Sequence, residues 1–108
     1  MKMIKAIVRP EKSEEVLEAL LQSGSAAATK TSVLGRGKQK GLKVGNTYYD
    51  EIPKEMIMVV VKDEEEDRII KIISDAARTD KNGTYGDGKI FVSTVERAVT
   101  ISSGNDEL

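Results

Sequence analysis

An unbroken apolar run at residues 56–61, with the sequence Met-Ile-Met-Val-Val-Val, constrains the fold of this chain more than any other feature. A strand with one solvent-exposed face alternates apolar and polar side chains, whereas this run is apolar at every position. The run therefore predicts a strand that is buried on both of its faces.

The segments before this run predict a strand, a helix and a second strand. Residues 3–8 are apolar-rich and of strand length. Pro10 suits a first helical turn, Leu17 and Leu20 belong to an apolar series at helical spacing, and Gly24 suits its end. Residues 29–34 are rich in β-branched and polar side chains and predict a weaker strand.

The segments after the run predict a second helix and two strands. Asp63 and Glu66 form a capping-box pattern, and residues 69–77 carry an apolar helical face. Residues 90–92 predict a strand, and residues 98–101 predict a short last one.

This order of elements is the βαββαβ pattern of the α+β ferredoxin-like fold, with a long loop at residues 36–54 between strands two and three. Right-handed crossovers place both helices on one face of the sheet. In a single domain of 108 residues, nothing remains to cover the other apolar face. We therefore expect the chain to self-associate, because such a face is uncommon on a stable monomer.

The composition removes several classes of function. The chain contains no cysteine and no histidine, which excludes disulfides, thiolate or histidine metal sites and catalytic triads built on either residue. No apolar run approaches the roughly 18 residues of a membrane span, so we expect a cytoplasmic protein outside the membrane. A single phenylalanine and loop-borne tyrosines give a sheet without stacking aromatics, so we expect no nucleic-acid partner.

Two glycine-rich stretches are the candidate binding sites. Residues 83–89 (Gly-Thr-Tyr-Gly-Asp-Gly-Lys) favour either a backbone nest that binds a phosphate or a turn that needs glycine for its conformation. Ile90 stands where a nucleotide-hydrolysing P-loop has serine or threonine, so we expect binding and not catalysis. Residues 36–54 carry five lysines and arginines against Asp50 and Glu51, which favours an anionic ligand or partner, or simply a solvated basic loop.

Three stretches together resemble the PII nitrogen-regulatory signalling proteins. They are Gly35-x-Gly-x-Gln-Lys-Gly41, a tyrosine-bearing loop closed by Pro53 and Lys54, and residues 85–92 (Tyr-Gly-Asp-Gly-Lys-Ile-Phe-Val). The likeness runs from residue 1 to about 104 and is most similar to the archaeal nitrogenase-linked subgroup. It implies a homotrimer that binds ATP or ADP between subunits, with 2-oxoglutarate beside Mg-ATP. It also implies a regulator that docks on a nitrogenase component or another protein of nitrogen metabolism.

The resemblance also implies which residues act. Nucleotide binding would fall to Thr29, Gly35, Gly37, Lys38, Val60, Gly86, Asp87, Gly88 and Lys89. Gln39 and Lys54 would hold 2-oxoglutarate and magnesium, with Gln39 the metal ligand through Mg-ATP. Docking on the partner would use Lys40, Lys43, Tyr48 and Tyr49 in the loop at 36–54. The loop at 79–89 would bind phosphate, and residues 104–108 would be a flexible tail.

Four positions depart from the family pattern. Lys38 replaces a usual arginine and Arg36 a common phenylalanine. Thr100 and Ser102 replace two arginines that in many members reach a neighbouring subunit's nucleotide. These departures keep an alternative open, in which the chain is a non-sensing interaction subunit that assembles with a paralogous PII protein in a mixed trimer.

Overall fold

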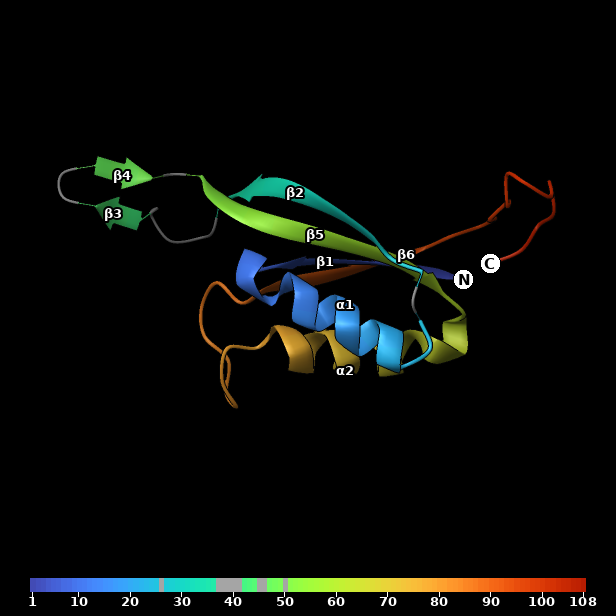
Figure 1. The fold of residues 1–108 in the computed structure, drawn as a ribbon, viewed down its shortest axis with the longest axis horizontal. Helices are drawn as coiled ribbons and strands as arrows, with labels where there is room; N and C mark the ends of the chain where they lie inside the picture. The colour runs from blue at the N-terminus through green and yellow to red at the C-terminus, as the bar shows by residue number, and fades with distance from the viewer. Residues whose placement is uncertain (26, 37–41, 45–46, 50) are drawn as a thin grey trace.

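The structure is a computed structural model that describes the chain except for residues 26, 37–41, 45–46 and 50 (Figure 1). Its centre is a four-stranded antiparallel sheet in the order β2-β5-β1-β6. The strands are β1 (Lys2–Val8), β2 (Thr29–Gly35), β5 (Ile52–Val61) and β6 (Gly88–Thr94). This order confirms the ferredoxin-like α+β fold that the sequence predicts.

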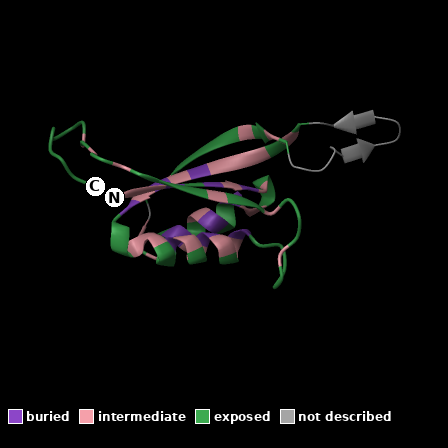
Figure 2. Ribbon diagram, turned by 180° about the vertical axis from the view of Figure 1, so that it is seen from behind, coloured by how far each residue is buried: buried purple, intermediate pink, exposed green. Residues whose placement is uncertain are grey.

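Both helices lie on the same face of the sheet (Figure 1). The short 3-10 turn η1 (Pro10–Lys12) leads into α1 (Ser13–Gln22), and η2 (Asp63–Glu65) leads into α2 (Glu66–Ala77). Their apolar sides meet the sheet in one core, coloured purple in Figure 2. The fully buried large side chains of this core are Ile4, Val8, Val16, Leu20, Ile57, Ile69 and Ile73.

The two faces of β5 have different surroundings, although both are apolar. Ile57, Val59 and Val61 are buried against the helices, because alternate residues of a strand point to one face. Met56, Met58 and Val60 alternate with them and are only partly buried. The second face of β5 is therefore apolar and only partly covered by the described residues, which is the condition from which self-association was inferred.

The segment expected to be one long loop contains regular structure. β3 (Leu42–Val44) and β4 (Thr47–Tyr49) pair as a two-stranded antiparallel sheet, which extends away from the helices beyond β2 and β5 (Figure 1). β5 also begins at Ile52, so Pro53 and Lys54 belong to a strand. The missed signal is the pair Gly45-Asn46 between two short runs, which favours a hairpin turn.

The predicted capping box and the predicted last strand are both wrong. Asp63 makes no capping hydrogen bond, and its carboxylate pairs at 2.9 Å with the amino group of Met1. Residues 98–101 form no strand and contribute only an isolated bridge from Val99 to Asp106. These residues do not join the main sheet, whose strand order is β2-β5-β1-β6.

The tail folds back on the residues before it. Besides the Val99–Asp106 bridge, the amide of Glu107 donates to the carbonyl of Ala98, and Arg97 Nε lies 2.9 Å from Asp106 Oδ1. The flexibility expected of residues 104–108 stays a prediction.

Candidate functional site

The glycine loop, defined as residues 83–88, lies beside two cations that are distant in sequence. Arg9 directly follows β1, and Lys54 lies near the start of β5. Because β1 and β5 are antiparallel, with Val8 opposite Glu55, these two residues come together at one end of the sheet. Since β6 pairs with β1 from Gly88 onward, the glycine loop ends at that same place.

Arg9 binds the glycine loop at two points. Its Nε donates to Asp87 Oδ1 at 3.0 Å, and its Nη2 donates to the carbonyl oxygen of Tyr85 at 2.8 Å. A planar guanidinium presents several donors in a fixed geometry, so it fixes the loop in orientation as well as in position. The sequence predictions missed Arg9, whose only local signal was a basic residue between a strand and a proline.

Asp87 holds the loop together from inside. Its Oδ2 accepts hydrogen bonds from the backbone amides of Thr84 at 2.8 Å and Thr79 at 3.3 Å. Burial would raise the pKa of Asp87, but the Thr84 amide, the Arg9 guanidinium and the Thr79 amide outweigh burial and lower its pKa to about 2. The carboxylate is therefore ionised at neutral pH and organises the loop as an acceptor.

Lys54 contacts the same loop. Its Nζ donates to the carbonyl oxygen of Gly86 at 2.6 Å. Burial and the nearby charge of Arg9 lower the pKa of Lys54, so its ammonium is held in an environment that disfavours positive charge. An anion placed beside Arg9 and Lys54 would relieve that unfavourable interaction. The predicted 2-oxoglutarate ligand Lys54 and the predicted phosphate ligand Gly86 are thus neighbours.

Two glycines in this region have conformations that other residues rarely adopt. Gly86 has φ 93° and Gly88 has φ 122°. A Cβ at Gly88 would lie 1.8 Å from the carbonyl oxygen of Ile7, so a side chain cannot fit there. Gly35, another predicted ligand, ends β2 beside Lys54, whose Cγ would be 3.3 Å from a Cβ at position 35.

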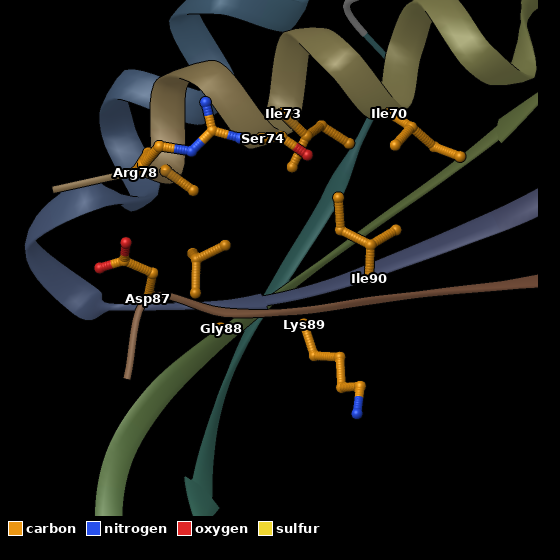
Figure 3. Close-up of a pocket in the computed structure, with 10 residues that line it drawn as sticks. Ile70, Ile73, Ser74, Arg78, Asp87, Gly88, Lys89 and Ile90 are labelled. Carbon is orange, nitrogen blue, oxygen red and sulfur yellow. The ribbon is translucent and has the colours of Figure 1, made fainter. Parts of the chain in front are cut away.

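Lys89 lies in β6 and points away from the helices (Figure 3). In the register it stands opposite Ile7, which is itself opposite Met56, so it belongs to the uncovered face of the sheet. This exposed lysine follows directly on the glycine loop.

The predicted adenine ligands Thr29 and Val60 lie elsewhere. They line a cavity of about 240 Å³ whose wall also contains Met58 and Leu108. Thr29 lies on the edge strand β2 and Gly88 on the opposite edge strand β6. The register separates Thr29 from Gly88 by three strand spacings and three residues. This is roughly 14 Å across the sheet and 10 Å along it. One chain therefore does not bring its two predicted groups of nucleotide ligands together.

The remaining predicted residues fall in or next to the undescribed part. Gly37, Lys38, Gln39 and Lys40 lie outside the described residues. For Lys43, Tyr48 and Tyr49 the backbone is described: Lys43 pairs with Tyr48, and Tyr49 pairs with Leu42.

Two other findings concern the described residues only. Within them, no group of three or more acidic side chains gathers that could hold a metal ion. None of their helices is long and apolar enough to cross a membrane.

The fold and the site define a ferredoxin-like domain whose glycine loop is fixed by an arginine and a lysine. Residues 1–105 match the family model for the nitrogen regulatory protein P-II. The chain therefore belongs to the P-II family, as its sequence motifs indicated.

Named relatives from methanogens are similar over nearly the whole chain. A nitrogen fixation nifHD2 region GlnB-like protein 1 of Methanosarcina barkeri is 56% identical over 108 residues, covering 100% of both chains. A nitrogen fixation nifHD region glnB-like protein 1 of Methanococcus maripaludis is 54% identical, covering 94% of this chain and 93% of its own. The nitrogen regulatory protein P-II 2 of Methanothermobacter thermautotrophicus is 45% identical, over 96% of this chain and 91% of its own.

Proposed function

We propose that this chain is a cytoplasmic regulator that senses adenine nucleotide and 2-oxoglutarate and controls nitrogen metabolism by docking on a nitrogenase component. Membership of the P-II family supports a regulatory role. The names of its relatives, which place them in nifHD regions of nitrogen fixation, support the link to nitrogenase.

The observation that carries the sensing role is the contact of Lys54 Nζ with the carbonyl oxygen of Gly86. It places a lysine suited to a carboxylate next to a glycine loop suited to phosphate, with Arg9 fixing that loop. A phosphate group bound by the loop would meet Lys89 on the uncovered face. A carboxylate beside it would meet Lys54, so the two ligands would bind next to each other.

A nucleotide that uses both predicted groups would require two copies of the chain. Thr29 and Val60 of one copy would contact the adenine, and the glycine loop of a neighbour would contact the phosphates. The uncovered apolar face supplies the contact for assembly, which in this family is a trimer. Magnesium would arrive with the ATP phosphates and would be completed by Gln39. The chain would bind these ligands without chemical turnover.

Titration calorimetry with ATP, ADP and 2-oxoglutarate, each with magnesium, tests the sensing role. Lys89→Ala should weaken nucleotide binding about tenfold, because it removes a charge-assisted phosphate contact. Lys54→Ala should weaken 2-oxoglutarate binding more than nucleotide binding. Lys81→Ala is the matched control, because Lys81 is an exposed lysine of the same connection between α2 and β6.

Docking is assigned to the hairpin formed by β3 and β4. Deleting residues 42–49 should abolish binding to the nitrogenase partner in a pull-down while leaving the assembly state unchanged. Mg-ATP with 2-oxoglutarate should release the partner and slow proteolysis at Lys40 and Lys43. A ligand shifts such an equilibrium only by binding one conformation more tightly than the other.

A second candidate function is favoured by Thr100 and Ser102. These short neutral side chains stand where many family members carry arginines. A chain without those cations would assemble with a paralogous P-II protein and leave sensing to it. Titration calorimetry would favour this role over sensing if none of the three ligands gave a heat of binding. Stable association of the chain with a co-expressed paralogue would support the same conclusion.

A further inference from the structure

Three of the four methionines of the chain lie on the face of the sheet that the helices do not cover. Met3 belongs to β1, and Met56 and Met58 belong to β5. Their sequence neighbours Ile4 and Ile57 are buried beneath the helices, and successive side chains of a strand point to opposite faces. The thioether groups are therefore gathered on the opposite face from the core.

Met3 and Met58 are diagonal neighbours on that face. The register of β1 with β5 places Met3 opposite Val60, which is two residues beyond Met58. Side chains in this relation start roughly 7–8 Å apart, a distance that long side chains can span. Both methionines line the cavity of about 240 Å³ that also contains Thr29 and Val60. Met56 lies on the same face but is not among the described residues of the cavity wall.

The cavity is open to small molecules, and its wall is almost entirely apolar. Met3 and Met58 are only partly buried. Among the described wall residues, Thr29 has the only polar side chain. Because the proposed function requires this cavity to admit an adenine ring from solvent, a much smaller hydroperoxide molecule can reach the same two methionines.

The composition directs oxidation of sulfur to methionine. The chain contains no cysteine, so methionine supplies its only sulfur atoms. A hydroperoxide converts a thioether to a sulfoxide: the S–O bond forms, the O–O bond breaks, the sulfur loses two electrons, and the peroxide is reduced to water or an alcohol. The product is a polar side chain where an apolar one had been, which disrupts methionine-rich contact surfaces.

We propose that Met3 and Met58 are an oxidation site through which hydroperoxides weaken nucleotide binding. The unoxidised thioethers give adenine a soft apolar wall, because methionine sulfur makes favourable contacts with aromatic rings. A sulfoxide oxygen in that wall loses water when the base enters, and this loss opposes binding. The effect on nucleotide affinity rests on the proposed function, whereas the oxidation of the two methionines does not.

Peptide mapping by mass spectrometry tests the oxidation site. The full-length protein is treated with hydrogen peroxide together with N-acetylmethionine amide as an internal standard. Met3 and Met58 should each gain the mass of one oxygen atom, and saturating Mg-ATP should slow both reactions. The proposal is overturned if the two residues stay unoxidised after the standard is converted. It is also overturned if Mg-ATP binds in calorimetry but protects neither residue.

Leucine variants connect oxidation with nucleotide affinity, because leucine preserves the volume of methionine and lacks the sulfur. Peroxide treatment should weaken nucleotide binding by the unsubstituted protein about tenfold in calorimetry, the effect of burying one poorly paired polar group. The double variant Met3→Leu with Met58→Leu should keep its affinity after the same treatment. Met56→Leu is the matched control and should remain sensitive to peroxide.

Reversal separates sulfoxide formation from other damage. Methionine sulfoxide reductase with a thiol reductant should restore the affinity, since it returns the sulfoxide to the thioether. Equal sensitivity of the double variant, or protection by Met56→Leu instead, would overturn the proposal. Failure of the untreated protein to bind nucleotide would contradict the proposed function and would leave the map of oxidised methionines unaffected.

Discussion

At Gly88, β6 approaches β1 so closely that a side chain has no room. The φ angle of Gly88 is 122°, and a Cβ built at this position would lie 1.8 Å from the carbonyl oxygen of Ile7. Gly88→Ala should therefore lower the free energy of unfolding by about 3 kcal/mol or more, from backbone strain plus a displaced strand. Urea denaturation measures the loss.

Gly24 is the matched control for this substitution. It also has a positive φ, 92°, but nothing lies within 4 Å of its would-be Cβ. Gly24→Ala should cost only about 1–2 kcal/mol, the conformational penalty alone. Similar losses at the two positions would show that crowding by Ile7 contributes nothing.

The Asp87 carboxylate gives a second prediction at this scale. Its pKa of about 2 lies below the ordinary value of 3.8, so the ionised form stabilises the folded state. That contribution is complete above about pH 4 and disappears as the pH falls through about 2. Asp87→Asn should cost about 1–2 kcal/mol at pH 6, after allowance for partial exposure, and almost nothing near pH 2. Denaturation of both proteins across this range checks it, and a constant difference would contradict it.

At the scale of elements, the C-terminal tail borders the predicted adenine site. Leu108 lines the cavity that contains Thr29 and Val60, and its side chain is about half exposed. A base in this cavity would pack against Leu108, because Leu108 forms part of the cavity wall. Leu108→Ser should therefore lower nucleotide affinity about fivefold, corresponding to the loss of roughly 1 kcal/mol of apolar contact.

Ile101 provides the control for the tail. It is an apolar residue of the same segment, 98% exposed, so Ile101→Ser should leave nucleotide affinity unchanged. Calorimetric titration of the two variants compares them directly. An unchanged affinity in Leu108→Ser would show that the tail does not contact the base.

At the scale of the whole molecule, the same substitution at two adjacent residues of β5 should have two different effects. Ile57 is fully buried beneath the helices, whereas Met56 belongs to the uncovered face. Ile57→Asp should unfold the protein, since an unpaired buried charge costs several kcal/mol. Met56→Asp should keep the circular dichroism of a folded chain but prevent the proposed self-association, as light scattering would report. A folded Met56→Asp trimer would place the subunit contact elsewhere.

Much of the fold could be predicted because its signals are local. The apolar run at residues 56–61, the helical spacing before Gly24 and the apolar face of α2 each depend on residues a few positions apart. Two of the errors arose where local patterns were ambiguous. Asp63 suits a helix cap but binds the amino group of Met1, and residues 98–101 have strand-like composition but form only one isolated bridge.

Only part of the candidate site could be predicted from the sequence. Glycines and a lysine in one stretch indicated either a phosphate loop or a turn that needs glycine, whereas the crowding of Gly88 by the carbonyl oxygen of Ile7 had no signal in the sequence. By contrast, Arg9 and Asp87 are 78 residues apart, and no spacing rule connects them. The sequence by itself thus determined the two helices, the four strands of the main sheet, the apolar faces and the glycine loop, because these follow from periodicity and backbone freedom. Only the tertiary structure decided which charges meet, because the register of antiparallel strands brings Arg9, Lys54 and Asp87 to one end of the sheet.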